Sequence, residues 1–202
     1  MPTSIVVVDD FLQNAEALRE AALRLDYPPQ GNTYPGRNST QRVDIEGLAG
    51  QVSRLVGEPL RPMPPPEAHG KFRITLAGDT GTGKVHVDKA HWSGILYLSR
   101  PEDCRGGTEF FRHRPTNTDR VPYDAAELAA TGYPTMEALI QDVIRRDGTD
   151  DDKWELTMRV PMRFNRLLLL RPWLWHTAGE AFGDRPANGR LVYLMFFGSA
   201  RA

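Results

Sequence analysis

The sequence predicts a mainly β protein with helices at its flanks, folded as a barrel or a sandwich. From residue 71 onward, short apolar or alternating runs of strand length follow one another, with turn-forming residues between them. They do not alternate with helices in the way that a parallel α/β sheet requires. The predicted strands cover residues 71–77, 85–88, 92–99, 106–111, 154–160, 165–170 and 190–197.

The N-terminal part, residues 1–66, is predicted to be a helical and extended support region. It contains a β-branched strand at 5–8, a helix capped by Asn14 that runs to about residue 25, and a second helix at 43–56. Residues 27–40 are rich in turn formers, and five prolines make 59–66 an extended connector. We interpret residues 1–202 as one domain, with a β core at 71–197 and a polar insert at 112–152 that holds one helix, at about 135–146.

Charge and composition limit the partners of the chain. The net charge of −1 gives no basic excess for nucleic acid. No stretch approaches the roughly 20 apolar residues of a membrane span, and the first residues do not resemble an export signal. A single cysteine, Cys104, excludes an intrachain disulfide. We therefore expect a soluble, cytoplasmic protein with no nucleic-acid partner and no membrane partner; its oligomeric state is left open.

Residues 77–91, AGDTGTGKVHVDKAH, contain two overlapping motifs. Gly78 to Lys84 match the G-x-x-x-x-G-K pattern of a phosphate-binding loop, which must open a helix and carry Ser or Thr after the lysine. Val85 occupies that hydroxyl position and no helix start follows, so we interpret the glycines as a turn between strands. His86 and Asp88 form an H-x-D pair, whose side chains would share one face of a strand and could bind one metal ion.

A third metal ligand is available at His176, which follows an apolar strand and two tryptophans. Two histidines and one carboxylate form the facial triad of non-haem iron(II) sites, and zinc can use the same ligands. Two alternatives remain, because an H-x-D pair also occurs by chance on surface strands and a histidine such as His176 can be a hydrogen-bonded core residue. We expect His69 and His113 to be ordinary surface residues, and we do not assign His91 as a ligand.

Arg190 begins the last predicted strand, both faces of which are apolar. A guanidinium in such surroundings needs an anionic partner, because an unpaired buried charge is costly. That partner could be a structural ion pair, or Arg190 could lie in the loop outside the barrel. A co-substrate carboxylate bound by two parallel hydrogen bonds would also satisfy it, and this favours an iron oxygenase over a zinc hydrolase.

In these motifs the chain resembles the Fe(II)- and 2-oxoglutarate-dependent dioxygenases. His86, Asp88, His176 and Arg190 match the order and spacing of that family's H-x-D, distant His and following Arg. HVDKAHWSGILYLS, GGTEFF and FNRLLLLRPWLWH are similar to its prolyl-hydroxylase branch, and VVDDFL and TYPGRNS resemble small bacterial oxygenases of secondary metabolism. The resemblance covers residues 71–197 and implies a double-stranded β-helix, a jelly-roll barrel of the cupin type.

The resemblance also implies roles for individual residues. His86, Asp88 and His176 would be the catalytic iron ligands, Arg190 would bind the distal carboxylate of 2-oxoglutarate, and Tyr97 would contact the same group. The family often has Ser or Thr two residues after the arginine, where this chain has Val192, and Thr108 is a possible replacement donor. Asp88 disfavours halogenation, since halogenases of this superfamily lack the carboxylate.

The implied activity is oxidation of an unactivated C–H bond of an amino acid or natural-product intermediate, with Fe(II) as cofactor and 2-oxoglutarate and O2 as co-substrates. The product could be a hydroxyl group, a double bond or a ring, including a cyclopropane. A zinc hydrolase or isomerase, or a non-catalytic ligand-binding barrel, are the alternatives. Candidate substrate contacts are Arg37, Asn38, Trp92, Arg112 and Trp175, although loop arginines are more often solvated and tryptophans more often part of a core.

Overall fold

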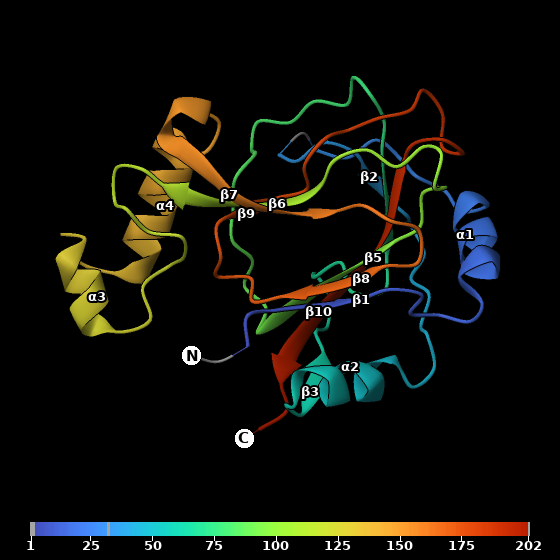
Figure 1. Ribbon diagram of the computed structural model, residues 1–202, viewed down its shortest axis with the longest axis horizontal. Coiled ribbons are helices and arrows are strands. Elements are labelled where there is room, and N and C mark those ends of the chain that lie inside the picture. Colours follow the sequence, from blue (N-terminus) through green and yellow to red (C-terminus); the bar gives the residue numbers. More distant parts are fainter. Residues whose placement is uncertain (1–2, 32, 202) are drawn as a thin grey trace.

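Two antiparallel sheets make up the centre of the protein, a computed structural model that describes residues 3–31 and 33–201 (Figure 1). The large sheet contains β1 (Ile5–Val8), β2 (Arg37–Asn38), β3 (Leu60–Pro62), β4 (Phe72–Thr75), β5 (Trp92–Tyr97), β8 (Leu167–Leu170) and β10 (Arg190–Ser199). Its strand order is β1-β8-β5-β10-β4-β2, with β3 paired to the far end of β10. The small sheet has the order β7-β6-β9, formed by β7 (Trp154–Pro161), β6 (Gly107–His113) and β9 (His176–Thr177).

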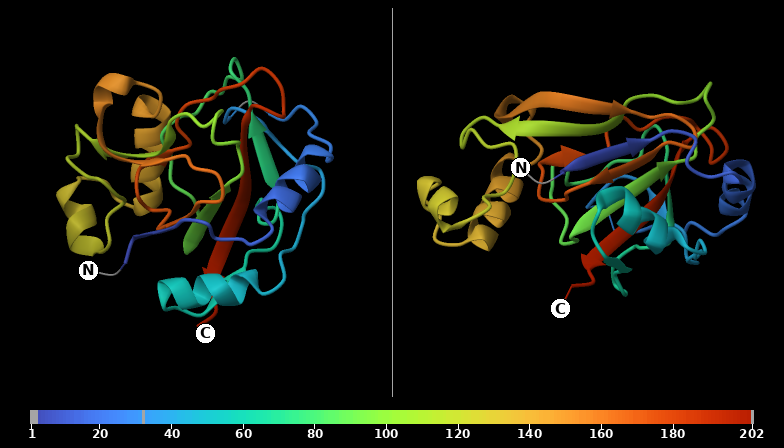
Figure 2. Two further views of the ribbon diagram at one scale, coloured as in Figure 1. Left: turned by 45° about the vertical axis from the view of Figure 1, so that its right-hand side comes forward. Right: turned by 60° about the horizontal axis from the view of Figure 1, so that its bottom comes forward.

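The two sheets lie one above the other, as both Figure 1 and the right view of Figure 2 show. Phe110 and Val160 of the small sheet pack against Leu168 and Leu170 of the large one. The chain is thus mainly β with antiparallel sheets, as the sequence predicts. Neither sheet closes on itself.

The side chains of strand β10 alternate between the two faces of the large sheet. Its residues 191, 193, 195 and 197 are buried in the main hydrophobic cluster on the outer face. Helix α2 (Leu48–Val56) covers that face with Leu48, Val52 and Val56, which recur every four residues and so lie on one side of the helix. Helix α1 (Ala15–Leu23) joins the same cluster. The alternate residues of β10, beginning with Arg190, face the space between the sheets.

The polar insert forms a separate hydrophobic cluster at one end of the sheets (Figure 1). It holds α3 (Ala125–Ala130), α4 (Met136–Asp147) and the short 3-10 helix η1 (Asp151–Lys153). The Thr135 side chain caps α4 by accepting a hydrogen bond from the Ala138 N–H. Leu139 and Val143 of α4 pack with Trp154 and Trp175, so the insert is anchored to the β core.

Several local predictions are wrong, each for an identifiable reason. The helix predicted at 43–56 begins only at Leu48, because Gly47 before it has a left-handed backbone with φ of 73°. Residues 85–88 form no strand; only His86 makes an isolated bridge, to His176. The insert has two α-helices and not one. Within 59–66, Leu60–Pro62 forms strand β3. Asn14 lies at the N-cap of α1, but its side chain makes no capping hydrogen bond.

His69 and His113 are also not surface residues. His113 is fully buried and lies between Thr116 and Asp147, with nitrogen–oxygen distances of 2.8 and 3.0 Å. Nδ1 of His69 lies 2.8 Å from the Phe196 carbonyl oxygen. Both rings replace lost solvation with hydrogen bonds, which is what burial of a polar group requires. Among the described residues, no helix is long and apolar enough to cross a bilayer.

A glycine just after β9, packed against the first residue of β6 in the small sheet, gives a test of this fold. Gly179 has φ of 78°, and a Cβ there would lie 1.9 Å from the Gly107 carbonyl oxygen. We expect Gly179→Ala to lower the free energy of unfolding by more than about 3 kcal/mol, since backbone strain of about 1–2 kcal/mol is added to a steric clash.

Gly57→Ala is the matched control, because Gly57 has φ of 72° and open space around its Cβ position. It should cost only about 1–2 kcal/mol. Both losses of unfolding free energy are to be measured by urea unfolding, followed by circular dichroism. Equal losses in the two variants would contradict the close approach at Gly179.

Candidate metal centre

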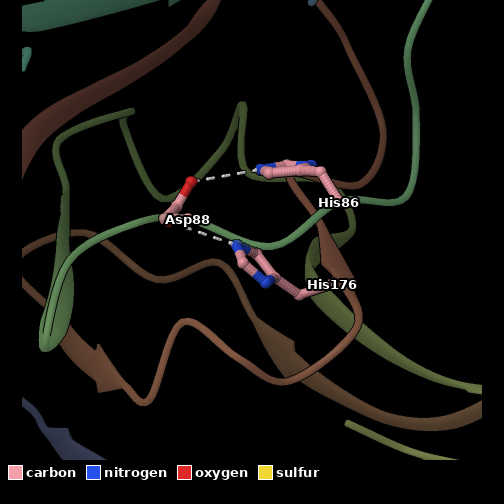
Figure 3. Close-up of side chains that lie close together, drawn as sticks. All are labelled: His86, Asp88 and His176. Carbon is pink, nitrogen blue, oxygen red and sulfur yellow. Dashed lines mark ion pairs between the residues drawn. The ribbon is translucent and has the colours of Figure 1, made fainter. Parts of the chain in front are cut away.

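His86, Asp88 and His176 converge between the two sheets, although ninety residues separate the histidines in sequence (Figure 3). Oδ1 of Asp88 lies 3.8 Å from Nε2 of His86, and its Oδ2 lies 3.6 Å from Nε2 of His176. One ligand atom from each residue lies within 4.8 Å of the others, which leaves room for a single ion at their centre. This is the two-histidine, one-carboxylate donor set.

Backbone hydrogen bonds bring the histidines together. The His86 N–H donates to the His176 carbonyl at 2.9 Å, and the His176 N–H donates to the His86 carbonyl at 3.1 Å. The Asp88 N–H donates to the Pro172 carbonyl. The H-x-D segment therefore lies against the chain leading to His176. A single β-bridge, and not the predicted strand, aligns His86 and Asp88.

Each histidine ring is held by the carbonyl two residues before it. Nδ1 of His86 lies 3.0 Å from the Lys84 carbonyl oxygen, and Nδ1 of His176 lies 2.7 Å from that of Leu174. A carbonyl only accepts hydrogen bonds, so in the neutral form of each ring the proton is on Nδ1 and the lone pair is on Nε2. Both free nitrogens are thus the ones that point toward Asp88.

The charge states suit a metal ion. Burial, and then the neighbouring His176 ring, lower the pKa of His86 to about 4, so this ring is neutral and able to bind at pH 7. Burial alone would raise the pKa of Asp88, but His176, His86 and a hydrogen bond from Ser93 at 2.7 Å bring it to about 2. The site thus presents the Asp88 carboxylate and the neutral His86 ring without first releasing their protons.

These ligands open into a cavity of about 740 Å³ between the sheets. Its floor is the inner face of the large sheet, where apolar side chains of β5, β8 and β10 predominate. Its polar lining includes Tyr34, Asn38, Arg73, Thr75 and Arg190. Predominantly apolar walls with a few polar groups are typical of a small-molecule site.

Arg190 is a buried charge without a protein partner. Its side chain lines the cavity from the first residue of β10, only 2 % of the residue is exposed, and burial lowers its pKa. Within the described residues, Nε and Nη2 have no hydrogen-bond partner. These two atoms lie on the same edge of the guanidinium, the edge that binds a carboxylate with two parallel hydrogen bonds. Arg190 is therefore neither in a structural ion pair nor in the loop outside the sheets.

Other candidate residues lie in different places. Asn38 lines the cavity. Tyr97 and Thr108 are buried and hydrogen-bonded to each other, with 2.7 Å between their oxygens, and they do not line it. Arg37 and Arg112 are also outside it, 3.9 Å from Asp79 and Glu155 respectively.

The tryptophans do not wall the cavity, which corrects that prediction. Trp92 belongs to the outer cluster and stacks against Arg171 at 4.2 Å, and Trp175 belongs to the cluster of the insert. His91 contacts Glu58 at 2.6 Å. Both tryptophans are bulky apolar groups that the core uses for packing.

Sequence reasoning missed Tyr34, Arg73, Thr75 and Ser93 at the site. Alternation along β4 and β5 would have placed Arg73, Thr75 and Ser93 on an inner face, had the cavity's position been known. Nothing in the local sequence marks Tyr34, whose ring lies 4.5 Å from that of His86. Gly81 and Gly83 of the phosphate-loop pattern pack against this segment, and Lys84 forms an ion pair with Asp151.

The sequence profile of a family of unknown function (DUF6445) matches residues 80–197, more than half of the chain. The chain belongs to this family. The residues matched to DUF6445 contain the complete triad and Arg190. No curated protein sequence matches the chain significantly.

Solved structures resemble the whole fold of this DUF6445 member at low sequence identity. SnoK, a non-haem α-ketoglutarate-dependent carbocyclase from nogalamycin biosynthesis, superposes with a TM-score of 0.57 at 14% identity, over 99% of this chain and 88% of SnoK. HygX from Streptomyces hygroscopicus, solved with nickel, 2-oxoglutarate and hygromycin B, gives 0.56 at 16% identity, over 98% and 84%. AviO1 from Streptomyces viridochromogenes Tue57 gives 0.51 at 17%, over 100% and 92%. The chain shares the fold of these proteins.

The lowered pKa of His86 makes the stability of the metal-free protein depend on pH. The unfolded ring gains a proton below pH 6.5, whereas the folded ring resists it down to about pH 4. The unfolded state is thus favoured as pH falls through this window, by about 2 kcal/mol between pH 7 and pH 5.

The test measures unfolding free energies at these two pH values for the wild type and for His86→Gln, which cannot titrate. The wild type should lose more stability than the variant. An equal loss in both proteins would show that His86 is not held neutral in the folded state. Asp88 does not interfere, because its own titration from 3.8 to about 2 lies below this range.

Proposed function

We propose that this protein is an Fe(II)- and 2-oxoglutarate-dependent oxygenase that oxidises an unactivated C–H bond of a small molecule, either an amino acid or a natural-product intermediate. The observation that carries the proposal is the pairing, in one cavity, of a two-histidine, one-carboxylate triad with a buried arginine whose carboxylate-binding edge is free. A hydrolytic zinc site does not need that arginine, whereas a chelating co-substrate with a second carboxylate does.

The donor set and the cavity fit the implied groups. His86, Asp88 and His176 would hold the iron on one side and leave its remaining positions open toward the cavity. Arg190 would bind the distal carboxylate of 2-oxoglutarate through Nε and Nη2. When bound, iron with 2-oxoglutarate and O2 supplies the oxidising power for C–H cleavage, and 2-oxoglutarate leaves as succinate and CO2.

Thr75 is the residue that would complete this carboxylate site. It lies directly opposite Arg190 in the β4–β10 pairing, so both side chains emerge on the same face, and both line the cavity. Its hydroxyl has no protein partner among the described residues. Thr75 would supply the donor that Val192 lacks, in place of Thr108, whose hydroxyl is bonded to Tyr97.

Further features support the same proposal. We propose that the two facing sheets constitute a double-stranded β-helix, the fold implied by the family resemblance. We also propose one domain, because the cavity is lined both by the N-terminal region, through Tyr34 and Asn38, and by the β core. The small-molecule context of HygX, solved with hygromycin B, and of SnoK, a carbocyclase, supports a natural-product substrate. Apolar side chains on the cavity floor would exclude water from the reacting position.

The proposed function is tested by co-substrate binding. Anaerobic protein loaded with Fe(II) should develop a weak visible absorption band on addition of 2-oxoglutarate. His176→Ala should abolish the band because a ligand is lost. Arg190→Met should need at least about thirtyfold more 2-oxoglutarate, since loss of one partner of a buried charge pair costs about 2 kcal/mol or more. A wild type that binds iron but shows no band at any 2-oxoglutarate concentration would refute the proposal.

Arg190→Met should also change the stability of the protein without ligands. Removing an unpartnered buried charge should raise the free energy of unfolding by about 1 kcal/mol or more. The measurement is denaturant unfolding of the metal-free proteins. Arg73→Met is the control and should be destabilising, since Arg73 donates several hydrogen bonds. A destabilised Arg190→Met protein would mean that Arg190 has a structural partner.

A further inference from the structure

Two arginines enter the cavity from neighbouring strands of the large sheet. Arg73 lies on β4 opposite Val192, and Arg190 lies two residues earlier on β10, so both side chains emerge on the inner face. Burial, and then the charge of Arg190, lower the pKa of Arg73. Arg190 keeps a free carboxylate-binding edge, but Arg73 does not.

The Arg73 guanidinium is bonded to the N-terminal segment that crosses the cavity. Nε donates to the Pro35 carbonyl at 3.0 Å, Nη2 donates to the Tyr34 carbonyl at 2.8 Å, and Nη1 donates to Oδ1 of Asn38 at 2.7 Å. One planar group therefore holds three points of a chain segment that contains only the two-residue strand β2. This geometry uses Arg73 as a clamp and not as an anion receptor.

The clamped segment places Tyr34 against a metal ligand. The Tyr34 ring lies 4.5 Å from the His86 ring at an interplanar angle of 43°, and both residues line the cavity. Within the described chain, its hydroxyl makes no hydrogen bond, so it is available to a bound molecule. The side of the triad next to His86 is thus covered by a residue from outside the β core.

The glycine-rich loop confirms how closely this segment is held. A Cβ on Gly81 would lie 2.8 Å from Cδ of Pro35 and 2.9 Å from the Thr33 carbonyl oxygen. The Gly83 N–H donates to that same carbonyl at 2.6 Å. The loop that resembles a phosphate cradle is therefore the outer support of residues 33–35, opposite the Arg73 clamp.

We propose that Arg73 is a positioning residue, which clamps residues 33–35 so that Tyr34 forms the wall of the substrate site beside His86. This inference rests on the proposed function for its metal and its substrate. It assigns the two inward arginines different tasks: Arg190 binds the co-substrate, and Arg73 shapes the space in which the substrate lies. Tyr34 then presents its hydroxyl to whatever molecule approaches the metal.

The test locates Tyr34 relative to the metal without requiring turnover. The six tyrosines are replaced by 3-fluorotyrosine, and the Tyr34 fluorine resonance is assigned from its loss in Tyr34→Phe. Mn(II) is then added anaerobically, with Zn(II) as the diamagnetic reference. Paramagnetic broadening decreases steeply with distance, so the Tyr34 signal should be broadened strongly in the wild type.

Two variants should release Tyr34 by different routes. Arg73→Met removes the clamp, and Gly81→Ala pushes against Pro35 without changing any charge. In both, broadening of the Tyr34 signal by Mn(II) should fall severalfold, while circular dichroism confirms folding. Arg112→Met, which removes an exposed cation with only a 3.9 Å contact to Glu155, is the control and should leave the broadening unchanged.

Co-substrate binding to the Zn(II)-loaded proteins, measured by calorimetry, separates the two arginines. Arg73→Met should change the 2-oxoglutarate Kd less than about fivefold, against at least about thirtyfold for Arg190→Met. Unchanged Tyr34 broadening in Arg73→Met, or an equal loss of 2-oxoglutarate affinity in both variants, would overturn the inference while leaving the oxygenase proposal intact. If Mn(II) broadened no tyrosine resonance in the wild type, the metal site would fail, and the proposed function and the inference with it.

Discussion

The buried, unpartnered guanidinium of Arg190 is the constraint on which the functional interpretation depends. Folding places a full positive charge on the inner face of the large sheet, and no carboxylate of the described residues forms an ion pair with it. Such a charge is costly, and a protein retains one where a ligand compensates it. The only anionic member of the triad, Asp88, is held by its own partners, Ser93 and the two histidines. A bound molecule with a carboxylate would balance this charge.

A second constraint joins this cavity to the metal site. The paired backbone bonds between His86 and His176 fix two distant segments at the edge of the small sheet, where β9 pairs with β6. The large sheet contributes Arg190 from the opposite side. A molecule that contacts both the triad and Arg190 must span the space between the sheets. The cavity between the sheets provides that space.

The β character and most strands could be predicted from the sequence, because alternation and apolar runs report burial on sheet faces directly. Element starts such as Leu48 could not, since a left-handed Gly47 and not the hydrophobic pattern decides where α2 begins. The convergence of His86, Asp88 and His176 could be predicted from motif spacing, even though residues 85–88 are not a strand. The His86 bridge aligns the pair without one.

The positions of residues that depend on long-range packing could not be predicted from the sequence. Trp92 and Trp175 are apolar enough for either a core or a cavity wall, and only the course of the chain decides between them. Tyr34 reaches His86 because Arg73, almost forty residues later, bonds the carbonyls of its segment. Neither residue carries a local pattern that distinguishes it from an ordinary loop tyrosine or strand arginine.

The division of the site along the chain has a functional consequence. The triad and Arg190 lie within residues 80–197, the part matched to DUF6445, whereas Tyr34, Asn38 and Arg73 precede it. The groups that would hold iron and 2-oxoglutarate thus come from one continuous stretch, and a large part of the polar wall facing the substrate comes from another. Changes in the N-terminal segment alter the shape of the cavity without altering the ligand set. Under the proposed function, substrate choice and oxidation chemistry would be carried by different segments, and the Arg73 clamp would be the contact that joins them.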